Sequence, residues 1–471
     1  MRGHLLSGRT QIPAICHDVK ISVRDAFRIH RLFEQLGYFR NINHRISLQM
    51  RLSMLGIMLD DLGELPIIKS AGIVLLKRGI VSHAALLIVD FREALLMKPR
   101  ERFYRIVEHE ESDRVPLDFW ITPAAYANVR DYLKITAPET QEWGIMSSWK
   151  ISEEMLRRLH LDFRRVYMKE ASSFKSKTYP DGTTDSEMGF RGKWFGPYWE
   201  VVHYPWADAT EMKQIEEYEW LDPDDPSRME GVVEWAKQLH EKGDYAVIGM
   251  VGGPWGVFEM CAHYMRGFDK FLVDLVEHTK LAEVMMDKCM NLALEMNRAF
   301  LDEVGQYIDV VQVGDDLGHQ NGLIMSPAMY RRLVKPRHMR IYQDIHRRAP
   351  NVKILYHSCG AIEPMINDLI EVGVDILNPI QPLAKGMDSA ELKKKYGSRL
   401  TFHGGIDLQH TMSTQGTKND LRAEVDRRLK ALAPGGGYIL APAHNIQDDS
   451  TPEKIVYLYD YAEKKGRYPI S

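Results

Sequence analysis

From residue 97 onward, short apolar runs alternate with longer amphipathic stretches. The runs are rich in β-branched residues, as in buried strands, and the stretches between them have the apolar spacing of helices. The expected strands span residues 114–120, 163–169, 245–251, 308–314, 352–356, 374–379, 400–403 and 438–442. The expected helices span residues 229–242, 268–304, 327–348, 362–372, 389–396, 419–432 and 452–465. This alternation predicts an α/β protein with a parallel sheet, and eight strands over this length fit a (β/α)8 TIM barrel.

Two segments depart from the alternation. Residues 172–224 are rich in Trp and Tyr, and we expect a β-rich insertion there that walls a pocket. Residues 1–96 show no clear succession of strand and helix, and their most apolar run, 67–91, is broken by charged residues. That run falls short of the roughly 18–20 uncharged residues that a membrane span needs. We therefore expect an N-terminal extension over residues 1–96 and a barrel domain over residues 97–471.

Composition and charge narrow the class of protein. The hydrophobic fraction of 45% and charged fraction of 27% are typical of a globular domain with a sizeable core. Lys and Arg number 61 against 65 Asp and Glu, so no overall basic field favours nucleic acid or an anionic membrane. Four scattered cysteines do not suggest a disulfide framework, and we expect a cytoplasmic protein.

The sharpest chemical signal lies where the fifth expected strand ends, at His357-Ser358-Cys359-Gly360. Barrel enzymes carry their active sites at the C-terminal ends of the strands, and residues i and i+2 of a strand point to the same side. His357 and Cys359 are therefore candidate ligands of one metal ion. Catalytic zinc takes three protein ligands and keeps a fourth position open. His444, after the eighth strand, is the preferred third ligand, with His403 and Asp315 or Asp316 as alternatives.

Other polar and aromatic residues follow the remaining strands. Asp315 and Asp316 come after the apolar run that ends at Gly314, where neighbouring carboxylates can orient a substrate or accept a proton. We assign them and His403 as candidate catalytic residues. Candidate substrate-binding residues also stand at strand ends: Trp120, Trp255, Asn378, Gln381, Asp407 and Asn445.

Several of these motifs resemble the uroporphyrinogen decarboxylase superfamily. Two motifs resemble the start of the family's sequences: Met97-Lys-Pro-Arg-Glu-Arg-Phe and Asp113-Arg-Val-Pro. Two others resemble its central helix: Ser326-Pro327 with Tyr330, and Lys335-Pro336. His357-Ser-Cys-Gly, Gly405-Ile-Asp407 and Pro442-Ala-His444-Asn445 resemble its branch related to corrinoid methyltransferases. The resemblance covers about residues 97–468. It implies a TIM barrel whose site lies at the C-terminal mouth.

The resemblance also implies a chemistry. Methylcobamide:coenzyme M methyltransferases of this superfamily hold zinc with a His-x-Cys motif and a later cysteine. His357 and Cys359 match the first two ligands, whereas His444 stands in the third position. The expected activity is zinc-dependent methyl transfer between a small molecule and a corrinoid. We expect a partner protein to supply the corrinoid, because this chain lacks the cobalamin-binding signature Asp-x-His-x-x-Gly.

Two alternatives remain. One is a metal-free decarboxylase of the uroporphyrinogen decarboxylase type, whose members carry an arginine-rich motif for the substrate's carboxylates. Residues 121–131, which follow the first expected strand, contain a single arginine, Arg130, and therefore no such motif. Residues 97–471 also hold 48 Lys and Arg against 57 Asp and Glu, and this negative balance disfavours a ligand with many carboxylates. The other alternative is a barrel that binds a small molecule or a partner without catalysis.

Overall fold

A curled parallel sheet forms the centre of the domain that begins at Met97. The computed structural model describes residues 97–143, 149–251 and 256–470. Seven strands are hydrogen-bonded in the order β14-β13-β12-β11-β8-β7-β3. Their bounds are β3 Phe163–Tyr167, β7 Ala246–Met250, β8 Val310–Gly314, β11 Lys353–His357, β12 Ile376–Ile380, β13 Thr401–Ile406 and β14 Tyr438–Pro442. All six pairings are parallel, as predicted for a TIM barrel.

The eighth position is filled by residues 114–121, and the sequence predicted a strand over residues 114–120 of this segment. This segment is not a regular strand: it makes single parallel bridges from Leu117 to Leu440 and from Ile121 to Ile446. On its other side, the carbonyl of Leu117 accepts the N–H of Asp162, directly before β3. Pro116 has no N–H, and the N–H of Leu117 donates to the Asp162 side chain, so a continuous ladder is interrupted.

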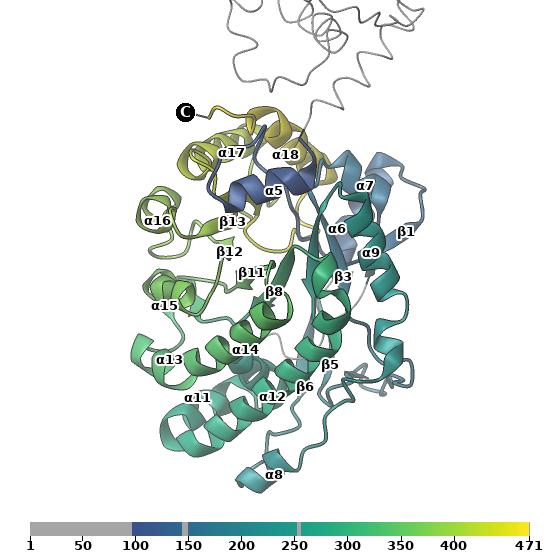
Figure 1. Cartoon of the computed structure of the whole chain (residues 1–471), viewed down its shortest axis with the longest axis vertical. Coiled ribbons are helices and arrows are strands. Elements are labelled where there is room, and N and C mark those ends of the chain that lie inside the picture. The colour runs from purple at the N-terminus through teal and green to yellow at the C-terminus, as the bar shows by residue number, and fades with distance from the viewer. Residues whose placement is uncertain (1–96, 144–148, 252–255, 471) are drawn as a thin grey trace, which may run out of the picture. The chain divides into compact units, whose positions relative to one another are not determined.

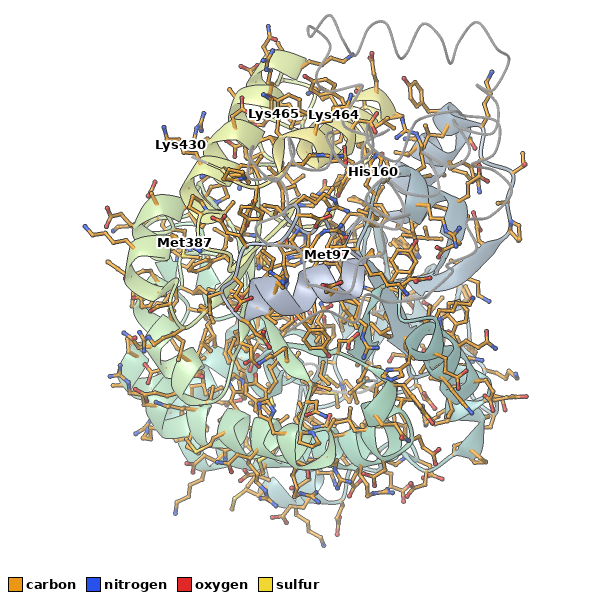
Figure 2. The ribbon with its side chains drawn as sticks, turned by 45° about the horizontal axis from the view of Figure 1, so that its top comes forward. Met97, His160, Met387, Lys430, Lys464 and Lys465 are labelled. Carbon is orange, nitrogen blue, oxygen red and sulfur yellow. The ribbon has the colours of Figure 1, made fainter. Side chains whose placement is uncertain are left out.

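Helices cover the outside of the sheet (Figure 1). The main ones are α6 Pro123–Leu133, α9 Val232–Lys242, α11 Phe268–Glu277, α12 Thr279–Val304, α13 Pro327–Leu333, α14 Lys335–Arg348, α15 Ile366–Glu371, α16 Ser389–Tyr396, α17 Lys418–Leu432 and α18 Pro452–Lys465. Lys430, Lys464 and Lys465 occupy the last turns of α17 and α18, where a positive charge complements the helix dipole (Figure 2).

Two predicted helices are divided in the structure. The one expected over 268–304 separates into α11 and α12 at His278, whose backbone is not helical. The one expected over 327–348 separates into α13 and α14 at Val334. Pro336 follows within the first turn of α14, and proline removes an N–H and crowds the preceding turn, so a helix begins there more readily than it continues.

The predicted insertion is β-rich. A three-stranded antiparallel sheet contains β4 Thr184–Asp185, β5 Arg191–Phe195 and β6 Tyr198–His203. Further small elements were not predicted: the hairpin β1 Glu139–Trp143 and β2 Trp149–Ser152, the helices α7 Glu153–Arg158, α8 Met212–Glu216 and α10 Val257–Glu259, the π-helical turn Met260–Met265, and the short pair β9 Gly318–His319 and β10 Gly322–Leu323.

Helix α5 Pro99–Val107 lies across the N-terminal ends of the strands. The N–H of Arg100 donates to Asp244 O just before β7, and the hydroxyl of Tyr104 donates to Asp309 just before β8 at 2.6 Å. Phe103 and Ile106 join a buried cluster with strand residues on one face, such as Phe163, Ile248, Val310, Leu355, Ile376 and Ile439. Because side chains alternate along a strand, this cluster marks the barrel interior, and α5 closes the end opposite the strand C-termini.

The other strand faces pack against the helices in a larger core, which includes Val247, Val311, Ile354, Leu377 and Leu440. In the part of the chain that the structure describes, no helix combines the length and apolarity needed to cross a bilayer.

Candidate metal centre

The turn after β11 carries the His357-x-Cys359 motif and is held by the segments that follow β8 and β12. The N–H of Cys359 donates to Asp316 at 2.8 Å, and the N–H of Gly360 donates to the Gln381 side chain at 2.7 Å. Gly360 has a φ of 85°, and a Cβ there would lie 2.5 Å from the backbone carbon of Gly318. Only glycine fits this close approach without strain, and the turn therefore fixes the direction of the Cys359 side chain.

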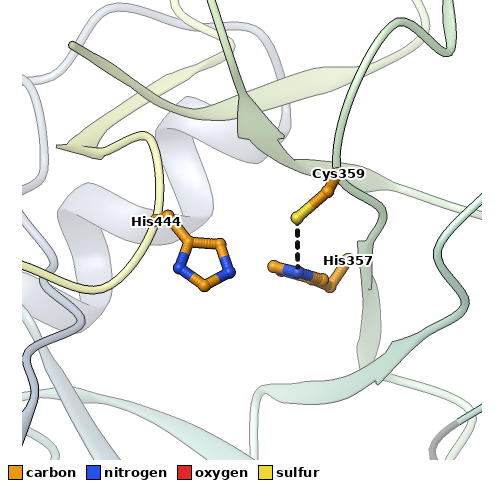
Figure 3. A group of neighbouring side chains, drawn as sticks. All are labelled: His357, Cys359 and His444. Carbon is orange, nitrogen blue, oxygen red and sulfur yellow. Dashed lines mark hydrogen bonds between the residues drawn. The ribbon is translucent and has the colours of Figure 1, made fainter. Parts of the chain in front are cut away.

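His444 reaches the same point from the loop after β14. One donor atom from each of His357, Cys359 and His444 can be chosen so that all lie within 4.8 Å of one another (Figure 3). Sγ of Cys359 is 3.4 Å from Nε2 of His357. Tetrahedral ligands of one zinc ion lie about 3–4 Å apart, and nitrogen and sulfur are donors that zinc selects. The residues that the sequence picked as metal ligands therefore form a set that fits zinc.

Burial sets the protonation of these three side chains. Desolvation lowers the pKa of His444 to about 4 and also lowers the pKa of His357, so both imidazoles are neutral near pH 7. Burial, together with the carboxylates of Asp316 and Glu259, raises the pKa of Cys359 well above its usual range. Neutral imidazoles are ready to bind a metal, whereas the thiol must lose a proton when it does.

The two adjacent aspartates have different surroundings. Asp315 is fully buried, and its carboxylate accepts hydrogen bonds from the backbone N–H groups of Phe258 and Glu259 and contacts His338 at 2.9 Å. Its interactions thus tie β8 to α10 and α14. Asp316 has a partly exposed side chain whose Oδ1 lies 3.8 Å from Nε2 of His357. Of the two, Asp316 is the one beside the candidate metal ligands.

His403 and Asn378 are buried inside the barrel rather than at its open mouth. Nδ1 of His403 is 2.6 Å from Nδ2 of Asn378, and Nε2 of His403 is 3.0 Å from the carboxylate of Asp118. Both ring nitrogens of His403 therefore have protein partners. Its catalytic role stays a prediction, as does substrate binding by Asn378.

The other predicted substrate-binding residues lie in different places. Trp120 is buried, and its ring stacks on His357 with centroids 5.1 Å apart and an interplanar angle of 7°. Gln381 binds the loop that carries Cys359. Asp407 accepts three backbone N–H groups from residues 409–411, so its carboxylate stabilises its own loop. Asn445 adjoins His444 and is half-buried, and Trp255 lies outside the described residues.

Two residues near the site were not predicted. Tyr198, at the start of β6, places its hydroxyl 3.5 Å from Nδ1 of His444 and accepts a hydrogen bond from Gln447 at 2.9 Å. The aromatic insertion was expected to wall a pocket, but its sequence gives no sign of which aromatic residue reaches a ligand. Glu259 has one buried carboxyl oxygen without a hydrogen-bond partner among the residues that the structure describes. Burial and the charges of Asp316 and Asp315 raise its pKa well above the usual range.

Comparisons with known proteins agree with this architecture. A family described as "Uroporphyrinogen decarboxylase (URO-D)" matches residues 202–465. A uroporphyrinogen decarboxylase of Thermus thermophilus is 24% identical over 275 residues, which cover 56% of this chain and 71% of that protein. The uroporphyrinogen decarboxylase of Prochlorococcus marinus subsp. pastoris is 21% identical over 261 residues, which cover 54% of this chain and 69% of that protein.

A solved structure described as a methyltransferase from Methanosarcina mazei has the same fold. It superimposes with a TM-score of 0.53 at 18% identity, over 78% of this chain and 99% of that one. The superposition supports the TIM-barrel assignment.

Proposed function

The chain belongs to the uroporphyrinogen decarboxylase family, and within that family we propose that it is a zinc-dependent methyltransferase that moves a methyl group between a small molecule and a corrinoid. The observation that carries this proposal is the convergence of His357, Cys359 and His444 at the C-terminal ends of two strands. A barrel that served only as a binding scaffold would not need two imidazoles and a thiol around one point.

His357, Cys359 and His444 would hold the zinc ion, and three protein ligands are the number that a catalytic zinc site takes when its fourth position is kept for substrate. When bound, zinc supplies a Lewis acid that keeps a thiol acceptor as thiolate or polarises the heteroatom that carries the methyl group. Asp316 is placed to accept the proton that a thiol gives up, or to orient the substrate, because its carboxylate lies beside His357. Trp120 holds the His357 ring in place through its stacked indole.

We propose that the corrinoid arrives on a separate protein that docks over the mouth of the barrel and that the reaction takes place in the cytoplasm. The small molecule would bind at this C-terminal face, where Tyr198 of the insertion lies next to His444. Closing an active site in this way excludes water from the reacting groups.

The experiment that tests this function is replacement of Cys359 by alanine. We expect at least a ~10-fold loss of zinc affinity, together with loss of cobalamin-dependent methyl transfer in a screen of methyl donors and acceptors followed by absorbance, because a charged ligand is removed. Cys261→Ala is the matched control, since Cys261 is a fully buried thiol 3.6 Å from Cys289 and belongs to the core. Zinc content should be unchanged in that variant. Equal zinc content in C359A and the parent protein would contradict the proposal.

Decarboxylation is the second candidate, because the two curated relatives described above are named uroporphyrinogen decarboxylases. Arg130, the only arginine in the segment that follows the first predicted strand, is exposed and pairs with Asp131 and Glu139. Decarboxylase activity on uroporphyrinogen that persists in C359A and in metal-free protein would favour this candidate.

A further inference from the structure

A chain of hydrogen bonds runs through the barrel interior from a buried ion pair to the first metal ligand. Arg165 donates two hydrogen bonds to the carboxylate of Asp118, at 3.0 and 2.6 Å. Asp118 is 3.0 Å from Nε2 of His403, whose Nδ1 is 2.6 Å from Nδ2 of Asn378. Oδ1 of Asn378 is 2.6 Å from Nδ1 of His357. Three of these five residues, His357, Asn378 and His403, are predicted site residues, and their connection to one another is a feature of the tertiary structure.

Alternation along the strands turns three of these side chains into the barrel interior. Arg165 is two residues after Phe163, Asn378 two after Ile376 and His357 two after Leu355, and each of those apolar residues belongs to the interior cluster. His357 and Asn378 are also register partners on β11 and β12. The five residues are between 0% and 4% exposed. The whole chain of hydrogen bonds is therefore buried.

The donors and acceptors of this chain can be arranged in one consistent direction. Burial alone raises the pKa of Asp118, but the charge of Arg165 and the hydrogen bond from His403 hold it well below its usual range, so the carboxylate only accepts. Nε2 of His403 must then carry the hydrogen, and Nδ1 accepts from the amide of Asn378. The amide oxygen in turn accepts from Nδ1–H of His357. The lone pair on Nε2 of His357 is left to face Cys359 at 3.4 Å.

We propose that Asp118, fixed by Arg165, sets the metal-binding tautomer of His357 through His403 and Asn378, and that these are positioning residues for the metal centre. The inference rests on the proposed function in that it takes His357 as a metal ligand. With the chain reversed, Nε2 of His357 would carry the hydrogen, and an imidazole nitrogen that bears a hydrogen cannot bind a metal. The partner of the second ring nitrogen decides which nitrogen is available.

The cost of burying these polar groups argues against a purely structural role. Interiors of TIM barrels are mostly filled by branched apolar side chains, and replacing buried ion pairs by apolar residues is often neutral or stabilising. A charged pair, an imidazole and an amide are instead buried in the hydrogen-bond chain that ends at His357. The fixed direction of these hydrogen bonds affects function only if the tautomer of His357 affects function.

The experiment compares Asn378→Leu with Asn378→Asp. Leucine removes both hydrogen bonds of the amide. Aspartate still accepts the hydrogen of His357 Nδ1, and His403 can take a second proton to donate to the new carboxylate. His403→Leu tests the chain one hydrogen bond further from the ligand, because the amide of Asn378 then loses its acceptor. Gln312→Leu in β8 is the matched control: this amide is also buried, and its side-chain atoms have no hydrogen-bond partner among the described residues.

Two readouts are taken on the full chain. Zinc affinity is measured by competition with a chelator, and the tautomer of His357 is read from the ¹⁵N chemical shifts of its ring in metal-free protein. We expect N378L to lose about 10–100-fold in zinc affinity and to acquire hydrogen on Nε2, with H403L changing in the same direction. N378D should retain both the affinity, within a few fold, and the Nδ1–H tautomer. Q312L should match the parent protein.

The outcomes separate this inference from the proposed function. An unchanged His357 tautomer in N378L, or equal losses of zinc affinity in N378L and N378D, would overturn the inference even if the parent protein binds zinc. If the parent binds no zinc, the proposed function fails, whereas the ring shifts of the metal-free variants still decide whether the chain sets the tautomer.

Discussion

At the scale of single residues, the site is built from side chains whose ordinary protonation is shifted by their surroundings. Cys359 is held as a thiol because burial and nearby carboxylates raise its pKa. The two histidines are held neutral because desolvation lowers their pKa values. In the metal-free site the Cys359 thiol therefore keeps its proton, and a cation that binds to the sulfur must displace it.

This protonation predicts the pH dependence of metal binding. Between pH 7 and 8 both imidazoles are already neutral, since the pKa of His444 is about 4 and that of His357 is below its usual value. Only Cys359 should release a proton on binding. Zinc affinity should thus rise about tenfold for this one-unit rise in pH, with about one proton released per zinc. Calorimetry in buffers of different ionisation enthalpy measures that number, and a release of two protons or none would contradict it.

At the scale of elements, α5 and the segment 114–121 are fastened to the sheet by a buried charged group. Arg102 of α5 and Arg114 both bind the carboxylate of Asp162, which precedes β3 and is fully buried. The N–H of Leu117 also donates to Asp162, at 2.6 Å. One carboxylate thus joins the helix that closes the barrel to the segment that fills its eighth position.

Replacing Asp162 by alanine should destabilise the protein by about 3–5 kcal/mol, because two largely buried guanidinium groups lose their shared partner. The free energy of unfolding in urea measures the loss. Asp131→Ala serves as a control, since the Asp131 side chain is 72% exposed and its pair with Arg130 lies at the surface. Exposed pairs contribute about 0–1 kcal/mol. Similar losses in the two variants would show that Asp162 has no such role.

At the scale of the whole molecule, residues 97–471 contain the strands, the helices that cover them, and both sets of core residues. The sequence predicts that this part is a domain separate from residues 1–96, which lie outside the described residues. A domain with its own core can fold alone.

Deleting residues 1–96 should therefore leave a folded protein with an unchanged thermal midpoint and unchanged zinc affinity. Differential scanning calorimetry of the two forms tests the first expectation, and chelator competition tests the second. A drop of many degrees would show that the extension is an integral part of the barrel.

The sequence by itself determined the repeating features of this protein. Short apolar runs rich in β-branched residues marked seven of the sheet strands, and amphipathic stretches marked the helices between them, because these signals arise from local geometry. The same local geometry marked His357 and Cys359, since a spacing of two at a strand end places both side chains on one side. The regular strand expected over residues 114–120 was wrong because Pro116 and the side chain of Asp162 interrupt its ladder.

Only the tertiary structure decided which distant residues meet. It brought His444 and Tyr198 close to His357 and Cys359. It also tied Asp315 to α10 and α14 while leaving Asp316 beside His357. It also connected Asp118 to His357 through two residues from other strands. These contacts depend on the curvature of the sheet and on the order of its strands around the barrel, and neither quantity is encoded in the spacing of residues along a single element.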